Sequence, residues 1–135
     1  MAKVIGIGGI FAHFKGETKS LYDWYEKNLG LDFSAYGTGF ISGEQLMVLT
    51  FKRDDNQDMP YLNFRVDDIK ALMNHLKSLN TEIISDIKDY DYGKFATIRD
   101  PFGNPIELWE ADHEAYKALV EKELNQYKLN KTPKL

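Results

Sequence analysis

Hydrophobic residues recur along the chain with two periods, one typical of helices and one typical of strands. Over residues 17–29, 67–79 and 112–128 they recur every three or four positions, which predicts amphipathic helices. Residues suited to N-capping stand near the start of each segment, and Gly30 follows the first segment as a stop signal. We therefore expect three helices, the last of them at the C-terminal end of the sequence.

Strand-like alternation occupies the segments between these helices. It is clearest in YLNFRVD, where Tyr61, Asn63 and Arg65 share one face and apolar residues share the other. The other predicted strands cover residues 3–14, two or three short segments within 31–53, and residues 82–88, 94–99 and 106–110.

The segment KFATIRDPFGNPIELWE predicts two strands joined by a tight turn. Pro101 presets φ at the second turn position, and Gly103 and Asn104 tolerate positive φ. Glu107 lies between two apolar residues of the second strand, so its carboxylate points to the opposite face. That face is either an ordinary solvent-exposed surface or a concave surface lined by Glu107 and Trp109.

The order of the predicted elements repeats, with a strand, a helix and three strands on each side of a polar segment. This order predicts an α+β fold in which two βαβββ modules form a cupped mixed sheet with the helices outside, followed by a C-terminal helix. The predicted bounds are 1–111 for the domain, divided into module one at 1–53, a linker at 54–60 and module two at 61–111, and 112–135 for the C-terminal helix and tail.

Composition narrows the classes of function. The chain has 135 residues, 43% of them hydrophobic, which is enough for a sizeable core. A net charge of −4 without a Lys/Arg-rich stripe argues against a nucleic-acid partner. The absence of cysteine excludes disulfides, thiolate metal sites and a cysteine nucleophile. The first apolar run is too short and too rich in glycine to span a membrane, so we expect a cytoplasmic protein with no membrane partner.

Three stretches carry a family resemblance: LYDWYEKNLGLDF, NFRVDDI and the ending DPFGNPIELWE. Together they resemble the vicinal oxygen chelate superfamily, which includes glyoxalase I, bleomycin and fosfomycin resistance proteins and extradiol dioxygenases. The resemblance covers about residues 4–110, and DPFGNPIEL is its most specific part. It implies paired βαβββ modules with a site inside the cup.

Metal-using members of this family bind a divalent ion through the first and last strands of each module. Only Glu107, among the positions carried over, has a side chain that the family uses for metal. A divalent ion needs several converging ligands, so we expect no cofactor, with a divalent metal as the alternative. The carried-over positions fall at Gly9 (or Gly8), at Leu49 or Thr50, at Tyr61 and at Glu107.

Aromatic and polar residues on the predicted concave face suggest a small-molecule pocket. Trp109 would stack on an aromatic or cationic compound, and Glu107 would neutralise it. The opposing hypothesis is a cup closed by its own aromatic residues, with Glu107 paired to Arg65 or Asn63. The predicted ligand-binding residues are Phe11, His13, Tyr61, Asn63, Arg65, Thr97 and Trp109, and Glu107 is the candidate catalytic residue.

Two alternative functions stay open at this point. A desolvated Glu107 could act as a general base next to a carbonyl, with His13 or Tyr61 as the acid; the metal-dependent form would be a lyase or isomerase of the glyoxalase I type. A non-catalytic dimerisation module would instead use the apolar stripe of the last helix. We expect a homodimer, because two-module proteins of the resembling family often pair.

Overall fold

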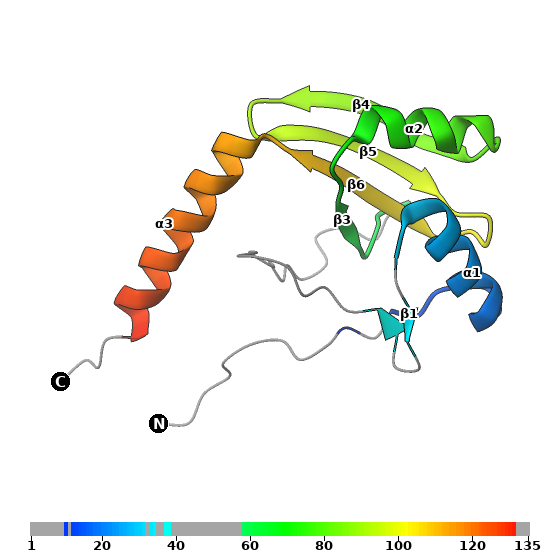
Figure 1. Cartoon of the computed structure of the whole chain (residues 1–135), viewed down its shortest axis with the longest axis horizontal. Helices are drawn as coiled ribbons and strands as arrows, with labels where there is room; N and C mark the ends of the chain where they lie inside the picture. The colour runs from blue at the N-terminus through cyan, green and yellow to red at the C-terminus, as the bar shows by residue number, and fades with distance from the viewer. Residues whose placement is uncertain (1–9, 11, 32, 35–36, 39–57, 132–135) are drawn as a thin grey trace.

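The computed structural model describes residues 10, 12–31, 33–34, 37–38 and 58–131 (Figure 1). Most of the strands predicted at 3–14 and within 31–53 lie outside these residues, and the described part of the first, residues 10 and 12–14, is not in a strand. The described elements are α1 (Thr18–Leu29), β1 (Phe33–Ser34), β2 (Gly37–Thr38), β3 (Asn63–Arg65), α2 (Ile69–Ser78), β4 (Glu82–Tyr90), β5 (Gly93–Arg99), β6 (Pro105–Ala111) and α3 (His113–Lys131).

Four of the strands form a mixed sheet in the order β3-β6-β5-β4. The strands β3 and β6 run parallel, and the other neighbouring pairs run antiparallel. Figure 1 shows α2 lying across one face of this sheet, while α3 extends away from it. The α+β class is therefore confirmed, and the elements from β3 to β6 follow the expected order of strand, helix and three strands.

The three helices begin where the sequence predicts. The carboxylates of Glu17, Asp68 and Asp112 each accept a hydrogen bond from a backbone N–H two or three residues later. Gly30 ends α1 in the left-handed conformation, with φ of 69°. None of the helices that the structure describes is long and apolar enough to cross a membrane.

The core lies between α2 and the sheet. Side chains alternate in the middle of β5 and β6, where Ala96, Ile98, Ile106 and Leu108 are buried on the side of α2 and the residues between them point to the opposite face. Glu110 also accepts a hydrogen bond of 3.0 Å from the Ile69 N–H, which ties the start of α2 to β6. The core residues with the least exposure are Ile69, Met73 and Leu76 of α2 and Ala96, Ile98, Ile106 and Leu108 of the sheet.

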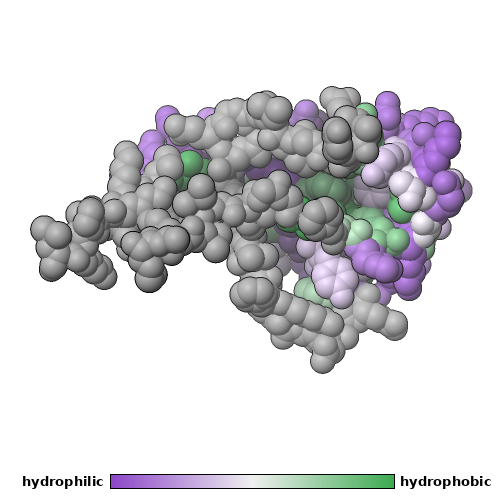
Figure 2. All heavy atoms as spheres, turned by 90° about the horizontal axis from the view of Figure 1, so that it is seen from below, coloured by the Kyte–Doolittle hydropathy of each residue, from purple (hydrophilic) through white to green (hydrophobic). Residues whose placement is uncertain are grey.

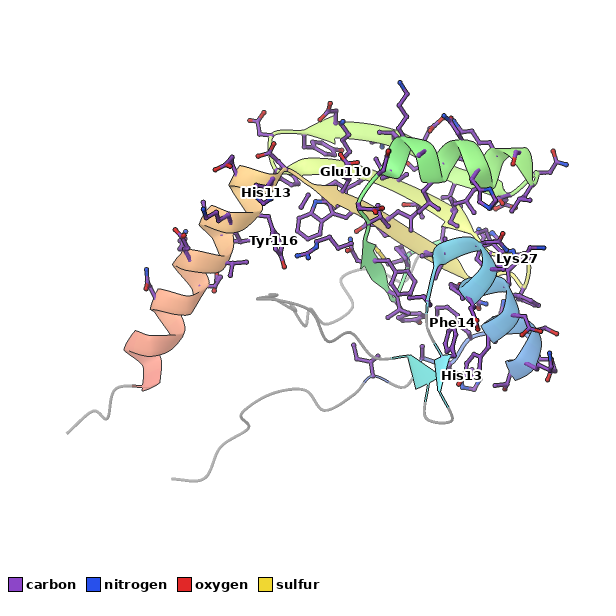
Figure 3. All side chains as sticks on the ribbon, in the orientation of Figure 1. His13, Phe14, Lys27, Glu110, His113 and Tyr116 are labelled. Atoms are coloured by element: carbon purple, nitrogen blue, oxygen red, sulfur yellow. The ribbon has the colours of Figure 1, made fainter. Side chains whose placement is uncertain are left out.

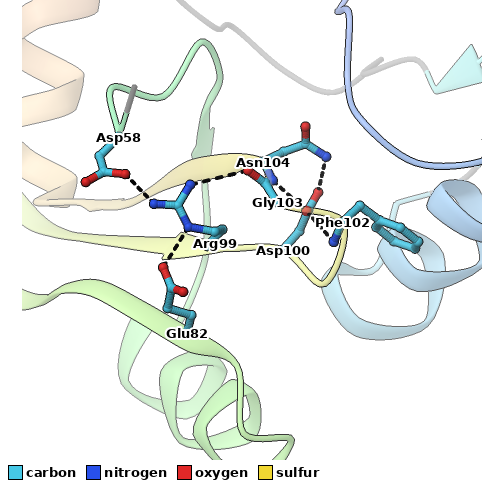
Figure 4. Close-up of polar contacts among 7 residues, drawn as sticks. All are labelled: Asp58, Glu82, Arg99, Asp100, Phe102, Gly103 and Asn104. Atoms are coloured by element: carbon cyan, nitrogen blue, oxygen red, sulfur yellow. Dashed lines mark hydrogen bonds and ion pairs between the residues drawn. The ribbon is translucent and has the colours of Figure 1, made fainter. Parts of the chain in front are cut away.

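The turn between β5 and β6 carries two buried polar residues, Asp100 and Asn104 (Figure 4). The Gly103 N–H donates to the Asp100 carbonyl at 3.1 Å, which places Pro101 at the second turn position as predicted. Gly103 takes the positive φ, 100°, whereas Asn104 contributes its side chain to the turn. The helix α1 lies beside this turn (Figure 1).

Candidate functional site

The sheet face turned away from α2, here called the distal face, carries a row of three polar side chains. Asn63 of β3 and Thr97 of β5 are the register partners of Glu107, which lies on the strand between them. The Asn63 side-chain amide donates a hydrogen bond of 2.6 Å to Glu107 Oε1. The pairing of Glu107 with Asn63, one of the two pairings of the opposing hypothesis, is therefore present.

A second row lies two residues further along the same strands. Arg65 and Phe95 are the register partners of Trp109. The rings of Phe95 and Trp109 are nearly parallel, with 9° between their planes and 5.6 Å between their centroids. Both side chains are half-buried, so part of each ring faces outward. An aromatic surface therefore lies next to the Glu107 carboxylate.

This aromatic surface continues in both directions. Tyr90 and Tyr92 stack on each other at 5.3 Å and both meet Phe95 edge to face. At the other end, Tyr116 of α3 meets Trp109 edge to face at 5.7 Å. The five rings form one aromatic run, and the two tyrosines at its β4 end are about half exposed, at 45% and 55%.

The positively charged side chain of Arg65 lies at the α3 end of the aromatic run. The Arg65 guanidinium carbon lies 4.2 Å from the centroid of the Tyr116 ring, which is cation–π geometry. Figure 3 shows Tyr116 projecting from α3 on the side that faces the sheet. Seen from the side opposite α2, hydrophobic side chains show between hydrophilic ones, which gather at the right edge and appear again at the upper left (Figure 2).

At the other end of the distal face, Arg99 pairs with two carboxylates (Figure 4). Its Nε donates to Glu82 at 2.6 Å, and its guanidinium also pairs with Asp58. The hydrogen bonds that Arg99 donates to Glu82 and Asp58 raise the pKa of Arg99 above its usual value. The Arg99 side chain is 24% exposed, and its partner Asp58 lies within the predicted linker.

The structure brings five of the eight predicted site residues together on the distal face. Tyr61 precedes β3 and is 76% exposed. His13 is exposed and lies ahead of α1, in a segment without strand structure (Figure 3). Phe11 lies outside the described residues. The five that share the distal face are Asn63, Arg65, Thr97, Glu107 and Trp109.

Phe95 of the distal face and Tyr116 of α3 contact Trp109 but were not predicted as site residues. Phe95 is two positions before Thr97 on β5, so the alternation of that strand predicts that both side chains lie on the same face. Tyr116 belongs to the apolar stripe of the last helix, and no local pattern indicates that it contacts Arg65. The position of Phe95 therefore follows from the sequence pattern, whereas the position of Tyr116 depends on where α3 lies.

The described residues do not fit the divalent-ion site that the resemblance implies. The neighbours of Glu107 in its row are an amide and a hydroxyl, and Asn63, rather than Tyr61, is its register partner on β3. Within the described ranges, no group of three or more His, Cys, Asp or Glu side chains is close enough to hold a metal ion. The chemistry that this row offers is hydrogen bonding and a negative charge.

The order of strand, helix and three strands from β3 to β6, folded into one mixed sheet, is that of a glyoxalase-like chain. The protein belongs to the Glyoxalase/Bleomycin resistance protein/Dioxygenase superfamily, whose family model matches residues 11–108. This membership confirms the resemblance found in the sequence. No curated protein matches the chain.

The solved structures that are similar to the chain include two proteins from Streptomyces sp. CB03234. TnmS3, an antibiotic binding protein from Streptomyces sp. CB03234, is 20% identical with a TM-score of 0.55, over 81% of this chain and 100% of that protein. A glyoxalase/bleomycin resistance protein from the same Streptomyces is 21% identical with a TM-score of 0.51, over 72% of this chain and 94% of that one. At such identities the likeness establishes the fold.

Proposed function

We propose that this protein binds a small planar aromatic or cationic molecule on the distal face, without a metal. The observation that carries the proposal is the juxtaposition of the Glu107–Asn63 pair with Trp109 and Phe95. A half-buried indole beside an oriented carboxylate provides stacking area and a counter-charge at one place. Binding then consists of stacking on Trp109 and pairing with Glu107.

The Asn63 hydrogen bond orients the carboxylate for this role. It occupies Glu107 Oε1, and Oε2 has no partner among the described residues. A cationic or hydrogen-bond-donating ligand can therefore contact Oε2 while Asn63 holds the carboxylate in place. Thr97, on the other side of Glu107, adds a hydroxyl that can donate or accept.

The similar fold of TnmS3 supports a binding role, because that protein is an antibiotic binding protein. Family membership supports a site on the distal face, since the family model covers the strands that carry it: β3, β5 and most of β6.

We extend the proposal to a cytoplasmic homodimer with the module bounds 1–53, 54–60, 61–111 and 112–135. Light scattering that shows a monomer at micromolar concentration would contradict the dimer.

The test is calorimetric titration with naphthylmethylammonium, a planar aromatic cation. We expect the Glu107→Gln variant to bind it about tenfold more weakly, because a charge-assisted contact is replaced by a neutral one. Glu26→Gln, which removes the same charge from an exposed position on α1, is the matched control and should bind normally. Trp109→Ala should also weaken binding, because the stacking surface is lost. Equal affinities in Glu107→Gln, Trp109→Ala and wild type would overturn the proposal.

A further inference from the structure

The helix α3 contributes to the distal face although it lies outside the family-matched region. The family model ends at residue 108, whereas Tyr116 belongs to α3. Tyr116 meets Trp109 edge to face and lies under the Arg65 guanidinium. A residue from the C-terminal helix therefore contacts two residues of the proposed ligand surface.

The position of the Arg65 side chain keeps its positive charge apart from the negative charge of Glu107. Glu107 is in the row next to that of Arg65, and the two rows are about 7 Å apart along the strands, at roughly 3.3 Å per residue. Side chains of this length could meet across that distance and neutralise each other. Instead Arg65 lies over Tyr116, and it forms no ion pair with a carboxylate among the described residues.

The distal face thus presents a negative group and a positive group at separate points beside Trp109. A ligand with a single charge would satisfy one of them. A flat aromatic ligand with a basic group at one end and an acidic group at the other would satisfy both and would cover the exposed part of the indole.

We propose that the ligand is a planar aromatic compound with a basic and an acidic group at opposite ends, and that Tyr116 is a positioning residue that holds Arg65 toward the acidic group. This inference rests on the proposed function and narrows its ligand class. Glu107 contacts the basic end, Trp109 stacks on the ring system, and Arg65 contacts the acidic end. The helix α3 is therefore part of the binding site.

The experiment compares three probes by calorimetry: naphthoate, naphthylmethylammonium and an aminomethyl-naphthoate with its charged groups at opposite ends of the rings. We expect wild type to bind the doubly charged probe about tenfold more tightly than either single-charge probe. Arg65→Gln should weaken the two acid-bearing probes about tenfold and should not weaken naphthylmethylammonium, because it removes a positive charge from the neighbourhood of that cation. Lys19→Gln removes a positive charge from the exposed surface of α1 and is the control for net charge.

Variants of Tyr116 test the positioning role. Tyr116→Phe retains the ring under the guanidinium and is the matched variant against which Tyr116→Leu is compared. Tyr116→Leu removes the ring and frees Arg65 to pair with Glu107. We expect it to weaken binding of both single-charge probes by about two- to fivefold, the range of an exposed cation–π contact. An effect on the basic probe distinguishes positioning from simple loss of ligand contact, because Tyr116 itself lies at the acidic end.

The outcomes separate the two proposals. If naphthylmethylammonium binds in a Glu107-dependent way but naphthoate does not respond to Arg65→Gln, the proposed function stands and this inference is overturned. Identical affinities of Tyr116→Leu and Tyr116→Phe would remove the positioning role of α3. If none of the three probes binds wild type, both the proposed function and this inference are overturned.

Discussion

The Tyr25 hydroxyl donates a hydrogen bond of 2.7 Å to the Asp100 carboxylate, and the two residues are 75 positions apart in the sequence. Asp100 is 3% exposed and also accepts from the backbone of its own turn. In the same turn, the Asn104 side chain bonds both the N–H and the carbonyl of Lys15. The polar residues of DPFGNP therefore join the α1 region to the sheet.

This relationship predicts that Tyr25→Phe destabilises the protein. The substitution keeps the ring, which is 4% exposed, but removes the donor to a buried carboxylate. We expect a loss of about 1–3 kcal/mol in the free energy of unfolding, as for a hydrogen bond to a charged group. Urea unfolding at neutral pH measures it. Tyr22→Phe, at a half-buried position of the same helix, is the control, and equal midpoints for the two variants would contradict the prediction.

The same contact predicts a loss of stability at alkaline pH. Burial, together with the Asp100 carboxylate, raises the pKa of Tyr25 far above its usual value of 10.0. The folded state therefore keeps the proton while the unfolded state releases it above about pH 10. Stability contributed by Tyr25 is complete below that pH and falls as the pH rises further. The difference in unfolding free energy between wild type and Tyr25→Phe should shrink between pH 9 and 11, roughly the range around the tyrosine pKa; a constant difference would argue against it.

Removing the second polar residue of the turn should cost more. Asn104 is 6% exposed, and its side chain bonds Lys15 twice and Asp100 once, at 2.8–2.9 Å. Asn104→Ala leaves buried polar groups without partners, so we expect a loss of about 2–4 kcal/mol. Thermal unfolding should show a lower midpoint than for Tyr25→Phe. A change below about 1 kcal/mol would mean that water replaces the lost bonds.

Gly93 lies where β5 begins, against Trp109. Its φ is 138°, and an added Cβ would be 2.5 Å from Trp109 Nε1 and 2.6 Å from the Glu110 carbonyl oxygen. Gly93→Ala should therefore destabilise the protein by about 2–4 kcal/mol through backbone strain and overpacking. It should also displace Trp109 and weaken binding of naphthylmethylammonium. Gly30→Ala, with φ of 69° and no atom within 4 Å of the added Cβ, is the control and should affect stability only.

The helices and the faces of the sheet could be predicted from the sequence because they depend on local periodicity. The caps at Glu17, Asp68 and Asp112 and the shared face of Thr97 and Glu107 follow from short spacings. Element types of this kind require no knowledge of how distant segments meet.

Contacts between distant segments could not be predicted in the same way. Nothing in the stripe of the last helix indicates that Tyr116 lies under Arg65, because that contact depends on the direction in which α3 leaves β6. The pairing of Glu107 with Asn63 rather than Arg65 was left open for a similar reason, since it depends on strand register. His13 was assigned to the face through a predicted strand whose described part has no strand structure.

The composition of the polar row also predicts how the protein responds to divalent ions. Glu107 is the one carboxylate in a row with Asn63 and Thr97, and a single carboxylate holds a divalent ion weakly. Titration with Ni²⁺, Zn²⁺ or Mn²⁺ should therefore leave the bound metal well below one ion per chain. Asn63→His is the positive control, because it places an imidazole next to Glu107 and should increase Zn²⁺ affinity at least about tenfold. Stoichiometric metal on wild type, removed by Glu107→Gln, would contradict the metal-free proposal and favour the metal-dependent alternative.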